Sequence, residues 1–227
     1  YDVSEENELE VLRAINNVNN SMKVAKLVIS NDSVWVCFEN LLDKEHKMEE
    51  LVPVAVSTLY QGRQRFYAAL KEELKRKQRE QLYNFECWAA SGKWNEFHRH
   101  HYDWWMFPYN QPSSYGEAYT VYDYEVNLLK KDSIFVRRYL RGVELLLLSW
   151  GWKLKDHKMV DNPDLFQDWA DWPIRLYKCA SSLLLFGFEK EFESVRTYAL
   201  RLISEEKNFW YDGKDCSELF RMDILNM

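Results

Sequence analysis

Glycine and proline are scarce in this chain, with 7 and 5 residues among 227. Because tight turns draw heavily on these two residues, their scarcity argues against a turn-dense all-β fold and favours long helices. Cysteine is scarce as well. The four cysteines lie far apart and form no C-x-x-C pair, which argues against a zinc site or a small disulfide framework and favours buried free thiols in a reducing compartment.

A long apolar run and an excess of basic residues are also missing. The apolar stretch at residues 143–150 is interrupted by Glu144 and Ser149 and is much shorter than the roughly 20 residues that a membrane span needs. The acidic N-terminus is unlike a signal peptide. A net charge of −6 disfavours a dedicated nucleic-acid-binding domain. We therefore expect a cytoplasmic protein without a membrane span.

The common signatures of catalysis are absent from the sequence. There is no P-loop, no G-x-G-x-x-G turn and no G-x-S-x-G elbow, and no cysteine stands in a recognisable nucleophile context. This favours a protein that is not an enzyme, and we expect neither a cofactor nor a bound metal.

Hydrophobic residues make up 47% of the chain and aromatic residues 16%, which predicts a packed core in one large domain or two small ones. Residues 5–20 predict a helix that ends in an asparagine-rich run. Residues 24–29 and 34–38 are rich in β-branched and aromatic side chains and are separated by Asn31-Asp32-Ser33, which predicts a β-hairpin. From Met48 onward the apolar spacing becomes helical.

The sequence changes character near Ser91-Gly92-Lys93, because nine of the ten tryptophans lie from Trp88 onward. We therefore predict two domains: residues 1–88, an α+β module with a long connecting helix, and residues 89–227, an aromatic-rich and mostly helical domain. The fold class is α+β, with a small N-terminal hairpin and helices followed by a larger, mostly α-helical part.

Several further elements are expected in the second domain. Residues 119–126 fit a strand or one wall of a helical domain. Helices are expected at residues 133–149 with Ser133 as N-cap, at residues 163–171, at residues 174–186 and at residues 189–206. In the helix at 163–171, Asp164, Asp168 and Asp171 would share one face, where an internal network with nearby arginines is expected.

Two resemblances to known families accompany these patterns. The phrase Ile15-Asn16-Asn17-Val18-Asn19, the hairpin and the amphipathic helix lie between Leu12 and about Leu74, and this segment resembles the second half of the YbjN family. These small bacterial proteins have a fold similar to type III secretion chaperones. The resemblance covers about a third of the chain and implies a chaperone-like module that binds other proteins without catalytic residues. Trp104 to Pro108, followed by Tyr139 to Gly142, resembles an uncharacterised helical bacterial family, which implies no particular chemistry.

The segment from His98 to Gly116 is the strongest candidate for a site, because it combines three histidines, three tyrosines and two tryptophans. Paired tryptophans at 104/105, 150/152 and 169/172 predict one aromatic cluster shared by three segments. Partly exposed members of such a cluster are typical either of hot spots for a protein partner or of stacking platforms for bases or sugars, and the first is favoured here. We therefore expect a non-catalytic adaptor, chaperone-like or regulatory protein that docks on another protein through Trp104, Trp105, Tyr109 and Tyr115.

An alternative is an enzyme or a protein that binds an anionic, nucleotide-like small molecule. Its pocket would set His98, His100, His101 and Asp103 against Arg137, Arg138 and Arg141, the polar side of the helix at 133–149. Histidine and carboxylate side chains also ligate zinc or iron, but no regular helical spacing of histidines is present. A role as hydrogen-bonded histidines in an aromatic wall is therefore favoured over a metal site.

Overall fold

A computed structural model describes residues 1–5, 7–39 and 47–222 of the chain. The chain forms two compact units, the first made of residues 1–75 and 113–118, the second of residues 76–112 and 119 onward. The expected α+β fold class is confirmed, since a small antiparallel hairpin accompanies mostly helical structure.

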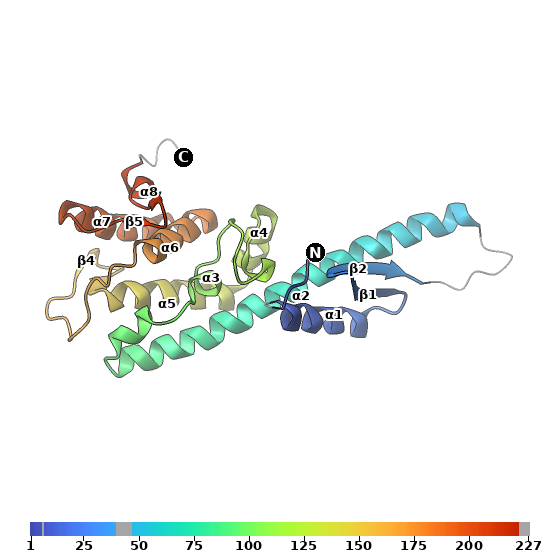
Figure 1. Cartoon of the computed structure of the whole chain (residues 1–227), viewed down its shortest axis with the longest axis horizontal. Coiled ribbons are helices and arrows are strands. Elements are labelled where there is room, and N and C mark those ends of the chain that lie inside the picture. The colour runs from blue at the N-terminus through green and yellow to red at the C-terminus, as the bar shows by residue number, and fades with distance from the viewer. Residues whose placement is uncertain (6, 40–46, 223–227) are drawn as a thin grey trace. The chain divides into compact units, whose positions relative to one another are not determined.

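One continuous helix, α2 (Met48–Ala90), contributes its first part to the first unit and its second part to the second (Figure 1). The sequence places a domain boundary at residues 88/89, whereas the compact units divide at residues 75/76. As the sequence predicts, the helix ends before Gly92, whose φ of 64° is left-handed and readily adopted by glycine.

The first unit contains α1 (Glu8–Ser21) and a hairpin of β1 (Ala25–Ser30) and β2 (Ser33–Phe38) beside the first part of α2 (Figure 1). The strands pair antiparallel with Leu27 opposite Val36. Asn31 and Asp32 both have positive φ, which gives the turn the twist that a two-residue hairpin favours. The core lies between the hairpin and the two helices and includes Val11, Ala14, Ile15, Val18, Leu27, Phe66 and Leu70.

Asn19 closes the outer edge of β1. Its side-chain amide donates to the carbonyl of Leu27 at 3.0 Å, and its side-chain oxygen accepts the Leu27 N–H at 2.8 Å. The amide thus satisfies the same two groups that a further strand would satisfy. One residue of the asparagine-rich run, Asn19, therefore also satisfies backbone groups at the free edge of β1, in addition to lying near the end of α1.

The second unit is mainly helical, and its described part contains two short antiparallel hairpins between its helices (Figure 1). Beside the second part of α2, its elements are η1 (Trp94–His98), α3 (Asp103–Met106), α4 (Asp123–Lys131), α5 (Ser133–Ser149), β3 (Trp152–Lys153), β4 (Lys158–Met159), α6 (Pro173–Phe186), α7 (Glu189–Ser204), β5 (Trp210–Tyr211), β6 (Lys214–Asp215) and α8 (Glu218–Arg221). A further single turn, η2 (Glu117–Tyr119), lies where the chain passes from the first unit back to the second.

Helices α6 and α7 pack against each other and are joined at Gly187, whose left-handed φ of 67° allows the sharp turn. Proline at the first position of α6 begins that helix, as the sequence predicts. The core of this unit is rich in large rings. Its fully buried aromatic side chains include Phe85, Phe97, Tyr102, Phe107, Phe135, Tyr139, Trp150, Phe186, Phe192 and Tyr198.

The helix predicted at residues 163–171 is wrong. The segment contains turns, with positive φ at Phe166 and Asp171. Tertiary bonds explain the difference, because the carboxylate of Asp164 accepts from the Trp94 indole at 2.9 Å and the amide of Gln167 donates to the Leu148 carbonyl at 2.8 Å. Asp164, Asp168 and Asp171 therefore do not share a helix face.

Two smaller expectations also need correction. Of the two interpretations of residues 119–126, the strand is wrong, since α4 begins at Asp123 and the segment belongs to the mostly helical unit. The N-cap of α5 is Asp132 and not Ser133, because the Asp132 carboxylate accepts from the backbone N–H groups of Ile134 and Phe135, both at 3.0 Å. Across residues 1–5, 7–39 and 47–222, the helices are too short or too polar to span a lipid bilayer.

Candidate functional site

The aromatic segment is the candidate stretch from His98 to Gly116, and its part in the second unit, residues 98–112, is held by a buried ion-pair cluster. One oxygen of the Asp103 carboxylate lies 2.7 Å from the Lys178 ammonium, and the other lies 3.4 Å from Nε of Arg175. The Arg175 side chain is only 2% exposed. Since both cations come from α6 at positions i and i+3, they face the segment from the same side of that helix.

Arg175 also binds the backbone of the segment. Its guanidinium donates to the carbonyl of Phe97 at 2.7 Å and to the carbonyl of His100 at 2.8 Å. The same group lies over the rings of Tyr102 and Trp172, with centroids at 4.5 and 4.9 Å. These contacts satisfy the buried charge, so the cluster holds the segment in place.

Ser182 extends this polar stripe of α6 by one further turn. Its hydroxyl donates to the Pro108 carbonyl at 2.7 Å and accepts from the Tyr139 hydroxyl at 2.9 Å. A glycine brings α5 close to the same segment, because a Cβ on Gly142 would lie only 1.9 Å from the Met106 methyl group. The segment from Phe97 to Pro108 is thus fixed at several points.

The charge state of the cluster follows from its surroundings. Burial acts to raise the pKa of the Asp103 carboxyl, but Lys178 and Arg175 outweigh it, so that its pKa lies below the ordinary value. The carboxylate is therefore charged at neutral pH and pairs with both cations.

The four residues expected to anchor a partner differ in accessibility. Tyr109 is buried, and burial raises its pKa to about 12. Trp104 and Trp105 are half-buried: Lys178 lies 3.3 Å from the centre of the Trp104 ring, and Lys77 lies 5.4 Å from that of Trp105. Tyr115 is 38% exposed and belongs to the first unit.

The three histidines of the segment have separate surroundings. His98 stacks on Trp150 at a ring distance of 5.8 Å, and neither of its buried ring nitrogens has a hydrogen-bond partner among the described residues. Burial, reinforced by the charge of Arg175, lowers the pKa of His98 to about 3. His100 is exposed, stacks on Trp88 and lies 3.4 Å from Glu96, while His101 is exposed.

The predicted aromatic cluster is present in part. Trp150 lies 5.0 Å from Trp169, and Trp152 lies 5.1 Å from Tyr198 (ring centroids), so rings from distant segments do meet. Within residues 1–5, 7–39 and 47–222, no three His, Cys, Asp or Glu side chains are grouped so that they could hold a metal ion.

The arrangement expected for the alternative function is not found in the described part of the chain. Asp103 pairs with Arg175 and Lys178 of α6, and no hydrogen bond or ion pair between described residues joins the histidine segment to Arg137, Arg138 or Arg141. The physical reason is proximity, because α6 brings two cations against the carboxylate. Arg137 and Arg141 of α5 instead line a separate groove.

This groove has a volume of about 940 Å³ and is open to solvent along one side of α5. Its apolar lining residues are Val136, Leu140 and Leu154, and we call these three residues its floor. Its other lining residues are mostly charged and come from α4, α5, α7 and the turn between β3 and β4: Lys130, Ser133, Arg137, Arg141, Glu144, Lys155, His157, Lys190 and Glu191. We call it the basic groove.

Charges on one wall of the basic groove neutralise one another. Arg141 binds both oxygens of Glu86, at 2.7 and 2.9 Å, and donates to Glu144 at 2.8 Å. Lys155 lies 3.0 Å from the other oxygen of Glu144. The hydrogen bond with Glu86 raises the pKa of Arg141 above its ordinary value. This network fixes the wall and leaves it with little net charge.

Three other cations of the basic groove make no ion pair with any described residue: Lys130, Arg137 and Lys190. Lys130 lies over the Phe188 ring at 5.9 Å. Of the two carboxylates in the lining, Glu144 is already paired with Arg141 and Lys155, which leaves Glu191 to oppose these three cations. The groove therefore combines an apolar floor with an excess of unpaired positive charge. Of the predicted residues it contains Arg137 and Arg141, whereas Arg138 is half-buried and lies outside its lining.

Sequence reasoning missed most of the residues that matter here. Arg175 and Lys178 are the only charges in α6, and two cations inside an otherwise apolar helix are a signal that a buried anion pairs with them. Lys130, Lys155 and Lys190 gave no such signal, because each belongs to a different element.

Comparison of the chain with known protein families, with curated proteins and with solved structures finds no match. The likeness of the N-terminal segment to the YbjN family therefore stays a prediction.

Proposed function

We propose that this protein is a non-catalytic binding protein and that its second unit takes up an acidic, amphipathic segment of a partner protein in the basic groove. The observation that carries the proposal is the juxtaposition of an apolar floor with Lys130, Arg137 and Lys190. An apolar ridge would cover the floor, and acidic side chains on its flanks would meet the cations.

The shape of the groove favours a peptide segment over a small molecule. Sites for small ligands are usually concave enough to bury most of the ligand surface, whereas this groove is open and follows α5 from Ser133 to Glu144. A helix or extended segment lying along α5 would use its whole length. Because the chain carries a net charge of −6, an acidic partner would be attracted to this groove and repelled by most of the remaining surface.

The surroundings of the aromatic segment favour the basic groove, and not the aromatic rings, as the docking surface. Tyr109 is buried, and Trp104 and Trp105 are engaged with lysine side chains, so these rings offer less free surface than the sequence suggested. The cations of the basic groove are the stronger candidates for partner contacts. Arginine in particular is enriched in interface hot spots.

Charge reversal of Arg137 and Lys190 tests the proposal. A suitable probe is a synthetic peptide of about 16 residues with leucine at helical i, i+3, i+4 and i+7 spacing, flanked by glutamate. We expect the double variant Arg137→Glu/Lys190→Glu to bind this peptide at least about tenfold more weakly, as measured by fluorescence anisotropy. We also expect binding by the unaltered protein to weaken as salt rises from about 50 to about 300 mM.

A matched control changes the net charge by the same amount as the Arg137/Lys190 double variant but leaves the basic groove unaltered. Arg79 and Lys207 are exposed and lie outside the lining, so Arg79→Glu/Lys207→Glu should bind the peptide as the unaltered protein does. Equal losses in both variants would show a general charge effect and overturn the proposal. If ATP stabilised the protein thermally while the peptide did not bind, the anionic small-molecule function would replace the one proposed here.

A further inference from the structure

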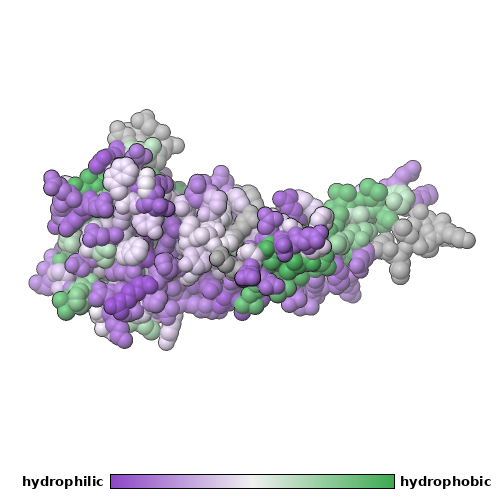
Figure 2. Space-filling model, in the orientation of Figure 1, coloured by the Kyte–Doolittle hydropathy of each residue, from purple (hydrophilic) through white to green (hydrophobic). Residues whose placement is uncertain are grey.

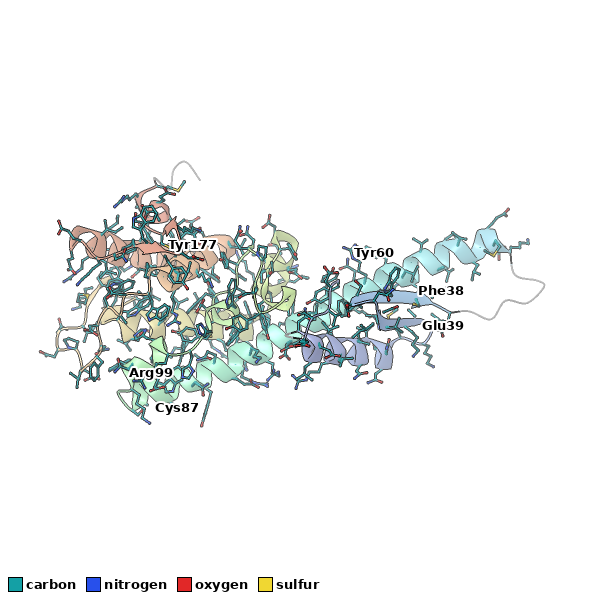
Figure 3. All side chains as sticks on the ribbon, viewed as in Figure 1. Phe38, Glu39, Tyr60, Cys87, Arg99 and Tyr177 are labelled. Atoms are coloured by element: carbon teal, nitrogen blue, oxygen red, sulfur yellow. The ribbon has the colours of Figure 1, made fainter. Side chains whose placement is uncertain are left out.

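The first turns of α2, in the first unit, carry an exposed apolar stripe. Val52, Val56 and Tyr60 follow one another at i, i+4 spacing and are 50%, 61% and 60% exposed. Residues at this spacing form one ridge of a helix surface. Figure 2 shows hydrophobic atoms along this part of α2, and Figure 3 labels Tyr60 on the same helix.

Opposite charges lie at the two ends of the stripe. Glu49 precedes Val52 by three residues, and Arg63 follows Tyr60 by three residues. Both side chains are exposed, and neither forms an ion pair with a described residue. Arg63 lies over the Tyr67 ring at 5.6 Å and keeps its charge available. Val52 and Tyr60 therefore lie at equal distances along the chain on either side of Val56, and so do Glu49 and Arg63, which carry opposite charges.

This symmetry is what a pair of identical antiparallel helices requires. If a two-fold axis passes at Val56, then Val56 faces its own copy, Val52 faces Tyr60, and Glu49 faces Arg63. Each apolar residue then contacts an apolar residue, and the contact between Glu49 and Arg63 occurs twice, once at each end of the helix pair. A parallel pair would instead place Glu49 against Glu49 and Arg63 against Arg63, which is unfavourable.

We propose that the stripe Glu49–Val52–Val56–Tyr60–Arg63 is the interface of a homodimer in which two copies of α2 pack antiparallel around Val56. The occupant of the stripe is a second copy of this chain, because an identical helix placed antiparallel offers the same symmetric spacing with the charges reversed. A four-turn contact is smaller than a standard protein interface, so we expect the dimer to dissociate on dilution.

The first experiment measures the molecular mass of the full chain by sedimentation between about 1 and about 500 µM, a range that covers weak association. We expect a monomer–dimer equilibrium. Val56→Glu, which places two like charges at the axis, should raise the dimer dissociation constant at least tenfold. A chain that stays monomeric throughout, or a dimer that Val56→Glu leaves unchanged, would overturn the proposal.

Charge exchange separates the pairing from a general effect of altered charge. Glu49→Arg alone should weaken the dimer, and Glu49→Arg with Arg63→Glu should restore it, since the exchanged pair is again complementary. Because both residues are exposed, neither variant is expected to disturb folding. A double variant as weak as the single one would contradict the antiparallel arrangement.

Cross-linking tests the axis directly. Cys37 and Cys87 are first replaced by serine, because they are accessible and could form unwanted disulfides. Cys179 and Cys216 are buried and can stay. Under mild oxidation, Val56→Cys should form a disulfide-linked dimer, since residue 56 faces itself. Val54→Cys serves as control, because Val54 is 55% exposed but lies two residues away on another side of the helix. Equal cross-linking of both variants, or none at residue 56, would refute the interface.

Discussion

Replacing Asp103 by alanine is expected to lower the free energy of unfolding by about 3–5 kcal/mol. Among the described residues, Asp103 is the only carboxylate that contacts Arg175 and Lys178, so the change leaves two buried cations without their partner. It also weakens the attachment of the aromatic segment to α6, because Arg175 holds the Phe97 and His100 carbonyls from the same position. The expected effect is therefore the largest of any single substitution proposed for this chain.

Urea unfolding followed by tryptophan fluorescence measures this effect. Asp161→Ala is the control, since Asp161 is exposed and pairs with Lys153 at 2.9 Å without burial, and we expect little change in stability. Replacing all three members of the cluster by apolar residues of similar size should recover part of the loss, because no unpaired charge then remains. A loss below about 1 kcal/mol for Asp103→Ala would contradict the role assigned to the buried cluster.

The stability of the second unit should decrease as the pH falls from about 6.5 towards 4, with His98 as the main cause. In the folded protein the pKa of His98 is lowered to about 3, from an ordinary value of 6.5. Between these values the unfolded chain binds one proton more than the folded chain. The free energy of unfolding therefore falls by up to about 1.4 kcal/mol for each pH unit in this window.

His98→Phe removes this dependence while keeping an aromatic ring against Trp150. We expect the variant to unfold with a flatter pH profile between about 4.5 and 7 and to exceed the unaltered protein in stability at the acidic end. This window excludes Asp103, because its folded-state pKa lies below the ordinary value of 3.8 and its contribution to stability is lost only as the pH falls below 3.8. His101→Phe is the control, since His101 is exposed. An unchanged slope in His98→Phe would show that other groups cause the pH dependence.

The N-terminal hairpin illustrates what local sequence can predict. Alternating β-branched and aromatic residues on both sides of Asn31-Asp32-Ser33 predicted two strands at 24–29 and 34–38, and the strands lie at Ala25–Ser30 and Ser33–Phe38. Both the alternation and the turn are properties of neighbouring residues, so no distant contact is needed to predict them. The bond from Asn19 to Leu27 was not predicted, because it joins two elements across space.

The segment at residues 163–171 illustrates the opposite case. Asn162-Pro163 and the spacing of three aspartates favour a helix locally, yet bonds to Trp94 and Leu148 hold the segment in turns. The basic groove was equally hidden. Arg137 and Arg141 were predicted as a polar helix face, but Lys130, Lys155 and Lys190 join them only through the packing of four separate elements.

The sequence alone determined the α+β class, the hairpin, the long helices and the aromatic character of the second half, because periodicity, caps and composition act over a few residues. Tertiary structure decided which charges meet: Asp103 pairs with α6, and Arg137 faces a groove together with lysines of other elements. The reason is that Coulomb interactions and desolvation depend on distance and burial in space, and neither can be read from spacing along a chain.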